Sequence, residues 1–228
     1  MIALGSIAPA YGADLATGTF TAEGPNLPTG LGNVRVHLVD RQGVDRLAGL
    51  FFVSPAQINF LVPADVPIPG YVIVNVENPG SSRIPGARSA IIAALAPELL
   101  TLDGTANGFA AATAIRIAQD GTQTALPVVD CRPNIGCAPV PIDLSVGGSV
   151  YLSLYGSGFS IAKQALCNGM AVSYVGPKLE IRGLDQINLL LPPKTPSGNF
   201  WISCTLDVVA PPAYGDTVYS NRVKILIK

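Results

Sequence analysis

Apolar and polar residues alternate in many short segments along the chain. Residues 34–39 read Val-Arg-Val-His-Leu-Val, so Val34, Val36 and Leu38 share one face. A period of two is typical of a β-strand with one buried face. His37 then lies on the opposite, solvent-facing side, and the sequence suggests no carboxylate or serine partner for it.

The same alternation predicts strands throughout the chain. They are expected at residues 71–76, 88–95, 150–155, 201–208 and 222–227, where β-branched and aromatic residues dominate. Residues 114–126 carry Asp120-Gly121 between two such runs, which predicts a hairpin with a tight turn. A short helix over 106–114 is the weaker alternative, because no apolar stripe of helical period continues beyond it.

One motif occurs twice. Gln57-Ile-Asn-Phe-Leu-Val-Pro63 matches Gln186-Ile-Asn-Leu-Leu-Leu-Pro192, and each copy follows a Tyr-Gly pair, at Tyr11 and Tyr155. The repeat predicts two similar units rather than a solenoid, which needs more copies.

The paired amides allow two interpretations. We expect Asn59 and Asn188 to bond backbone groups at a strand end, with Pro63 and Pro192 stopping the strand. A binding role for these amides is the alternative, in which Gln57 and Gln186 also take part.

The length of 228 residues fits two immunoglobulin-like β-sandwiches of about 100 residues each. We expect an all-β fold with one sandwich over residues 1–96 and a second over 97–228. Residues 128–147 are expected to form an inserted loop closed by a disulfide.

Composition excludes several classes of function. The net charge is −1, which argues against a nucleic-acid partner, since neutralising phosphates needs a surplus of Lys and Arg. No run of 18 apolar residues is present, so no membrane span is expected. One His and no nucleophile or metal constellation predict a non-enzymatic protein without cofactor or metal. Asp103 and Asp120 open turns that lack the ligand spacing of a calcium loop.

The four cysteines are Cys131, Cys137, Cys167 and Cys204. Their even number fits disulfides and an oxidising compartment. Of three possible pairings we favour Cys131–Cys137 with Cys167–Cys204. Zinc is disfavoured because no Cys-x-x-Cys occurs, and unpaired buried thiols are the remaining alternative.

The motifs resemble a family. The string Ser54-Pro-Ala-Gln-Ile-Asn-Phe-Leu-Val-Pro63 is the most specific part, and Tyr151-Leu-Ser-Leu-Tyr-Gly-Ser-Gly158 and Ser220-Asn-Arg-Val223 support it. The chain resembles the Solibacter-type C-terminal domain of secreted acidobacterial proteins and, more distantly, IPT/TIG-type modules. The resemblance implies a tandem immunoglobulin-like unit at the cell exterior and carries no catalytic or ligand residues. The start lacks a signal peptide, so an exported protein would be represented here by its mature form or a fragment.

Function is expected to rest on surfaces. Few charges and an apolar Met1-Ile2-Ala3-Leu4 suggest an extracellular structural protein that assembles with itself by donating this strand to a neighbour, as a filament does. Equally, both termini could be ordinary strands of their own sandwiches. The alternative function is an adhesion module that binds a glycan or another surface protein through loops at one end of a sandwich.

Overall fold

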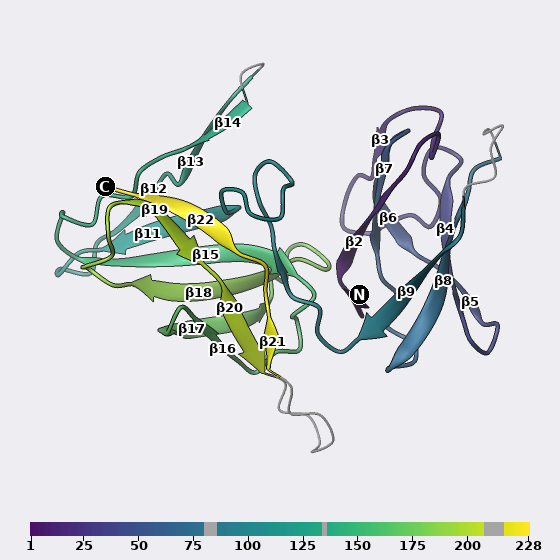
Figure 1. Cartoon of the computed structure of the whole chain (residues 1–228). Helices are drawn as coiled ribbons and strands as arrows, with labels where there is room; N and C mark the ends of the chain where they lie inside the picture. The colour runs from purple at the N-terminus through teal and green to yellow at the C-terminus, as the bar shows by residue number, and fades with distance from the viewer. Residues whose placement is uncertain (80–85, 134–135, 208–216) are drawn as a thin grey trace. The chain divides into compact units, whose positions relative to one another are not determined.

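The structure, a computed structural model, describes residues 1–79, 86–133, 136–207 and 217–228 (Figure 1). Its described elements are all β-strands, which confirms the all-β prediction. No helix in these ranges is long and apolar enough to span a membrane. The chain divides into two compact units: unit 1 is Met1–Ala96 with Lys178–Leu184, and unit 2 is Pro97–Pro177 with Asp185–Lys228.

Unit 1 is a sandwich of a five-stranded sheet, in the order β1-β9-β8-β4-β5, and a four-stranded sheet, in the order β2-β7-β6-β3. The strands are β1 (Ile2–Ala3), β2 (Ile7–Tyr11), β3 (Phe20–Thr21), β4 (Arg35–Asp40), β5 (Asp45–Leu47), β6 (Gly49–Val53), β7 (Gln57–Leu61), β8 (Gly70–Glu77) and β9 (Arg88–Ala93). The inner residues of both sheets, such as Val36 and Leu38 of β4 and Ile58 and Phe60 of β7, form one buried core. The predicted alternation over 34–39 is therefore confirmed.

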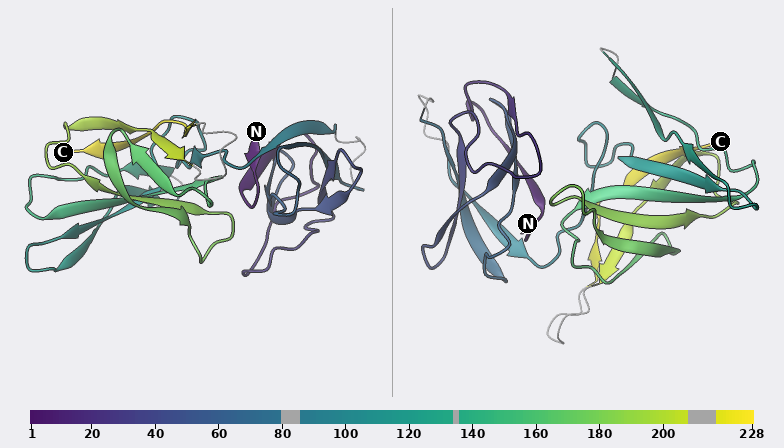
Figure 2. Two further views of the ribbon diagram at one scale, coloured as in Figure 1. Left: turned by 90° about the horizontal axis from the view of Figure 1, so that it is seen from below. Right: turned by 180° about the vertical axis from the view of Figure 1, so that it is seen from behind.

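Unit 2 is built on a longer sheet in the order β12-β11-β15-β18-β17-β16-β20-β21, with β10 beside β15. Its strands are β10 (Glu98–Leu99), β11 (Ala112–Ile117), β12 (Gln123–Leu126), β13 (Val129–Arg132), β14 (Gly136–Pro139), β15 (Ser149–Ser157), β16 (Gln164–Cys167), β17 (Met170–Pro177), β18 (Asp185–Leu191), β19 (Gly198–Ile202), β20 (Cys204–Asp207), β21 (Val218–Tyr219) and β22 (Val223–Ile227). In the right-hand view of Figure 2, β11, β15 and β18 lie in front of β22, so the two layers face each other. Leu152, Leu154, Ile187 and Ile225 fill the space between them.

The prediction of one continuous strand over 201–208 is wrong. The chain breaks at Ser203 into β19, which pairs with β22, and β20, which pairs with β16 and β21. Asn168 causes the break, because its side chain donates to the Trp201 carbonyl and accepts from the Ser203 N–H. Val208 lies outside the described residues.

The structure also tests the predicted hairpin over 114–126 and the predicted loop over 128–147. The hairpin over 114–126 is confirmed as β11 and β12, and no helix forms over 106–114, where Ala110 instead makes a β-bridge with Thr101. The insert over 128–147 is not a plain loop, since β13 and β14 pair as an antiparallel hairpin. A disulfide directly across two strands supports pairing in a ribbon that would be marginal alone.

Both termini belong to their own units. Ile2 and Ala3 pair with Ile92 and Ala93 of β9, and Ala3 is buried. At the other end β22 pairs with β19. The N-terminal segment is thus an ordinary edge strand in this structure, and donating it to a neighbour would first require breaking this pairing.

Candidate functional site

The repeated motif forms the same arrangement in both units. Gln57 of β7 lies opposite Tyr11 of β2, and Gln186 of β18 lies opposite Tyr155 of β15. In each copy the glutamine Nε2 donates to Oδ1 of the asparagine two residues on, at 2.8 Å in unit 1 and 2.6 Å in unit 2. The isoleucine between them is fully buried in both copies.

The expectation for Asn59 and Asn188 needs correction. Both lie inside their strands, and their side chains bond a glutamine side chain rather than backbone at a strand end. Residues two apart in a strand point to the same side, which brings the two amides within reach. The prolines do follow the strand ends, since β7 ends at Leu61 and β18 ends at Leu191.

In unit 2 the motif lies on a broad uncharged surface, which we call the amide–tyrosine face. It is the outer side of β12, β11, β15, β18 and β17, and strand alternation assigns its residues. They are Gln123, Ala125, Thr113, Ile115, Ile117, Ser149, Tyr151, Ser153, Tyr155, Gln186, Asn188, Leu190, Tyr174 and Gly176. None of them carries a formal charge, and no described segment crosses this side in the right-hand view of Figure 2.

Two tyrosines flank Gln186 across three neighbouring strands. Tyr155 lies opposite it on β15, and on its other side the phenol of Tyr174 covers Gly176, where a Cβ would come within 3.1 Å of the Tyr174 hydroxyl. The Tyr174 hydroxyl donates to the Pro177 carbonyl at 2.7 Å, which fixes the ring. Because neighbouring strands are about 4.8 Å apart, the two strands that carry these tyrosines, β15 and β17, lie about 10 Å apart.

Hydrogen bonds hold this face in place and leave donors and acceptors free. The hydroxyls of Thr113 and Tyr155 are 2.9 Å apart, and Gln186 also reaches the Ser153 hydroxyl at 3.4 Å. No hydrogen bond from a described residue uses Oε1 of Gln186 or Nδ2 of Asn188. The surface therefore offers one acceptor and one donor beside two aromatic rings. Beyond Tyr174, an open groove of about 490 Å³ runs between β16 and β17.

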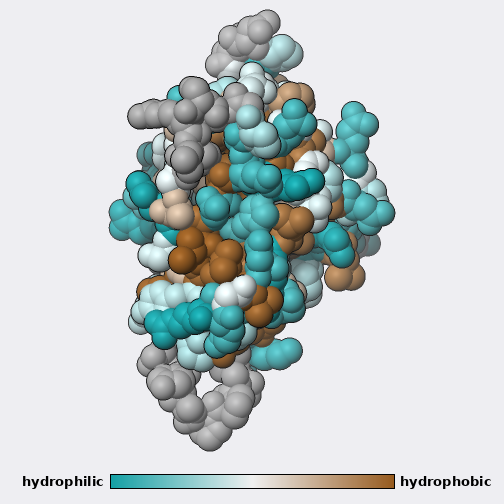
Figure 3. Space-filling model, turned by 90° about the vertical axis from the view of Figure 1, so that its right-hand side faces the viewer, coloured by the Kyte–Doolittle hydropathy of each residue, from teal (hydrophilic) through white to brown (hydrophobic). Residues whose placement is uncertain are grey.

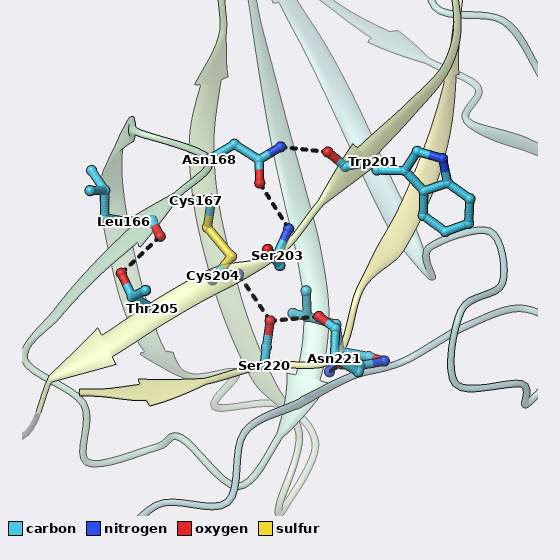
Figure 4. The surroundings of a disulfide bond; sticks show 10 residues. Leu166, Cys167, Asn168, Trp201, Ser203, Cys204, Thr205, Ser220 and Asn221 are labelled. Atoms are coloured by element: carbon cyan, nitrogen blue, oxygen red, sulfur yellow. Dashed lines mark hydrogen bonds between the residues drawn. A yellow bond between two sulfur atoms is a disulfide. The ribbon is translucent and has the colours of Figure 1, made fainter. Parts of the chain in front are cut away.

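Both favoured disulfides are present. Cys167 and Cys204 lie opposite each other on β16 and β20, and both are buried. Figure 4 shows the hydrogen bonds around them: the Cys204 N–H donates to Ser220 at 3.0 Å, and the Thr205 hydroxyl donates to the Leu166 carbonyl at 3.2 Å. The second disulfide, Cys131–Cys137, joins β13 to β14 and is exposed. Two disulfides indicate an oxidising environment.

His37 has the carboxylate partners that the sequence did not suggest. Its Nδ1 is 2.8 Å from Asp45 and its Nε2 is 3.2 Å from Glu77. Partial burial opposes charging of the ring, but the two carboxylates outweigh it and raise the pKa of His37 above its usual value. With both nitrogens engaged by carboxylates, neither is placed to take a proton from a nucleophile.

Asp185 is the most buried acid among the described residues, with 1% of its surface exposed, and Asp40 follows with 8%. It begins β18, and its Oδ2 accepts the Phe159 N–H at 2.7 Å. Desolvation raises the pKa of Asp185 to about 6, although backbone N–H groups of residues 158–160 oppose the shift. Its Oδ1 is buried without a hydrogen bond from a described residue.

The outer side of the five-stranded sheet in unit 1 combines exposed apolar side chains with charged ones such as Asp45 and Glu77. Tyr71, Ile73, Ile91 and Leu47 are exposed there, and the Arg41 guanidinium stacks on the Tyr71 ring at 4.6 Å. Figure 3, which faces unit 1, shows brown apolar areas separated by teal polar side chains. Nothing in the structure indicates what would cover them.

No group of three or more His, Cys, Asp or Glu in the described ranges could hold a metal ion. The two aspartates of the candidate calcium turns are used within their own turns. Asp103 accepts hydrogen bonds from the N–H and hydroxyl of Thr105, and Asp120 accepts one from the Thr122 N–H.

Comparison with known proteins assigns no relative: no protein-family model and no curated protein matches the chain. The resemblance drawn from the motifs therefore stays a prediction. The sequence did not predict the amide–tyrosine face as a site, although it predicted the strand over 150–155 and contained the Gln-Ile-Asn motif, one copy of which lies on this face. The alternation of Tyr151, Ser153 and Tyr155 with buried residues was the available signal.

Proposed function

We propose that this protein is an exported, non-enzymatic binding module that holds a neutral polysaccharide on the amide–tyrosine face. The observation that carries the proposal is an exposed five-stranded sheet side with three tyrosines, paired amides and no formal charge. The disulfides support export to the cell surface or beyond, because such bonds persist outside the reducing cytosol.

The chemistry of this face fits sugar rings. The apolar side of a pyranose packs against an aromatic ring, while its hydroxyls both donate and accept hydrogen bonds. Tyr155 and Tyr174 offer two rings on strands about 10 Å apart, and Gln186 lies on the strand between them. A charged ligand would find no counter-ion on this side.

Binding should be measured by calorimetry and by co-sedimentation with a panel of neutral polysaccharides, such as cellulose, xylan and mannan, with polygalacturonate as the charged comparison. We expect Tyr174→Ala and Tyr155→Ala each to weaken binding about tenfold, which is about 1.4 kcal/mol. Tyr11→Ala is the matched control, since Tyr11 is the equivalent of Tyr155 in unit 1 and is 70% exposed.

Salt provides a second criterion. Binding of an uncharged ligand should be nearly independent of ionic strength, whereas an ionic contact is screened. Failure to bind any neutral polysaccharide, or equal binding by wild type and Tyr174→Ala, would overturn the proposal.

A further inference from the structure

The strand at one edge of the unit 2 sheet is unprotected. β12 is the last strand in the order, with no described strand beyond it, and its sequence is Gln123-Thr-Ala-Leu126. Gln123, Thr124 and Ala125 are exposed. Natural sheet edges are usually guarded by charges, proline, a bulge or very short length, because unpaired backbone groups invite another strand.

Most other edges in the described structure carry such guards. β5 contains Asp45 and Arg46, β2 contains Pro9, and β1 and β21 have two residues each. The ribbon of β13 and β14 carries Asp130, Arg132 and Pro139. β12 has none of these features. β19 (Gly198–Ile202) lacks them too, but it is largely covered, whereas Gln123, Thr124 and Ala125 of β12 are all exposed.

The register of β12 determines which of its backbone groups are free. The Ala118 N–H donates to the Thr122 carbonyl at 2.9 Å, and Thr124 lies opposite Arg116. Hydrogen-bonded pairs alternate along an antiparallel ladder, so Thr122 and Thr124 bond inward to β11. Gln123 and Ala125 therefore direct their N–H and C=O groups outward.

We propose that two copies of the protein pair antiparallel through β12, around a two-fold axis at Thr124. Gln123 of one copy then exchanges two hydrogen bonds with Ala125 of the other, and the converse pair does the same. The two Thr124 residues face each other. A self-complementary edge of this kind gives a closed dimer. The edge has no ionisable side chain, so bringing two identical copies together creates no repulsion between like charges.

Pairing would join the two amide–tyrosine faces, because Gln123 and Ala125 lie on the same side as Ile117 and Ile115. A long polymer could then contact both copies at once, which strengthens binding by raising the effective concentration. The dimer itself does not depend on glycan binding, so the two proposals can fail separately.

The test is sedimentation equilibrium of the whole chain without ligand, at concentrations up to about 1 mM, where weak association is detectable. Ala125→Pro removes one outward N–H, and proline is tolerated at an edge position whose N–H faces solvent. We expect wild type and the control Ala125→Ser to dimerise with similar affinity, and Ala125→Pro to dimerise at least tenfold more weakly. Circular dichroism checks that the variants fold.

A cross-link tests the axis independently. Each Cys of the described structure is in a disulfide, so Thr124→Cys adds one thiol. Facing residues at the axis have Cβ atoms about 4.5–5.5 Å apart, close enough for an intermolecular disulfide after small adjustment. Oxidation should cross-link Thr124→Cys at high concentration and leave Gln123→Cys largely uncross-linked, because Gln123 faces Ala125 of the partner. A monomeric wild type, unchanged dimerisation of Ala125→Pro, or equal cross-linking of both Cys variants would overturn the proposal.

Discussion

The two copies of the Gln-Ile-Asn motif have the same internal contacts but differ in the residues that precede them. Each has the same glutamine-to-asparagine hydrogen bond and the same buried isoleucine. Before the motif in unit 1, however, the Ser54 hydroxyl accepts the Gln57 N–H at 3.0 Å, whereas in unit 2 the residue before the motif is the buried Asp185, whose carboxylate accepts the N–H of the distant Phe159. The hydrogen bond within the motif therefore follows from the strand geometry that both units share. The residues before the motif differ and bond different partners.

The units also differ in what holds them together. Unit 1 relies on its core and on contacts such as the ion pair at 2.8 Å between Arg46 and the buried Asp40, whereas unit 2 adds two disulfides and a buried acid, Asp185, that forms no ion pair with a described residue. The single tryptophan, Trp201, lies in unit 2, so its fluorescence reports unfolding of that unit alone. The stability of unit 2 can therefore be measured separately from that of unit 1.

Removing the buried disulfide should have the largest effect. Cys167 and Cys204 are 37 residues apart, and the closed loop restricts the unfolded chain, so Cys167→Ala with Cys204→Ala should cost about 4 kcal/mol. Cys131→Ala with Cys137→Ala should cost about 2 kcal/mol or less, because that loop spans only 6 residues. Urea unfolding followed by Trp201 fluorescence measures both, and a larger loss from the exposed pair would contradict this ranking.

Truncating the two equivalent isoleucines should come next. Ile58→Ala and Ile187→Ala each leave a cavity at a position with 0% exposure, at a cost of about 3 kcal/mol. Calorimetry should detect both losses, whereas the Trp201 transition should shift only for Ile187→Ala. A shift of that transition by Ile58→Ala would mean that the units unfold together.

The stabilities of the two units should also depend on pH in opposite directions, with a smaller change in free energy. The folded pKa of Asp185, about 6, lies above its unfolded value near 3.9, so the folded state binds the proton more tightly. Its contribution to stability is complete below about pH 4 and is lost as the pH rises through 6, a decrease on the order of 2 kcal/mol in unit 2.

In unit 1 the Arg46 guanidinium lowers the pKa of Asp40, so that contribution is present above about pH 4 and is lost on further acidification. Unfolding of wild type between pH 4 and 6, followed by Trp201 fluorescence, should therefore show a slope that Asp185→Asn flattens. An identical slope in the variant would show that Asp185 is not the titrating group.

The amide pairs should contribute least to stability. Gln57→Ala removes one partly exposed hydrogen bond, and Gln186→Ala removes the equivalent bond and the longer contact with Ser153, so each variant should lose about 0.5–1 kcal/mol. The two variants should differ in function instead, with only Gln186→Ala weakening polysaccharide binding. Equal loss of binding in both would place the site on both units.

Much of the fold followed from local patterns. Period-two alternation predicted the strands, Asp120-Gly121 predicted the hairpin, and the short Cys131–Cys137 spacing favoured its disulfide. These features depend on residues close in sequence, where geometry leaves few choices.

The errors came from distant partners. The break at Ser203 depends on Asn168, which is 35 residues earlier, and the environment of His37 depends on Glu77, which is 40 residues later. Tyr174 reaches the outer side through a bulge between Val172 and Tyr174, and the simple alternation does not show such a shift. The amide pairs, in contrast, could have been predicted from the spacing of two between glutamine and asparagine.

The buried disulfide also has a mechanical meaning. Three strands, β17, β18 and β19, lie in sequence between Cys167 and Cys204. When the two ends of the chain are pulled apart, force passes through the sulfur–sulfur bond and bypasses these strands. Unfolding under tension then releases roughly 130 Å less chain than an unlinked unit would, at about 3.5 Å per residue. β18, the strand that carries Gln186 and Asn188 of the amide–tyrosine face, would thus stay within a covalently closed loop under load.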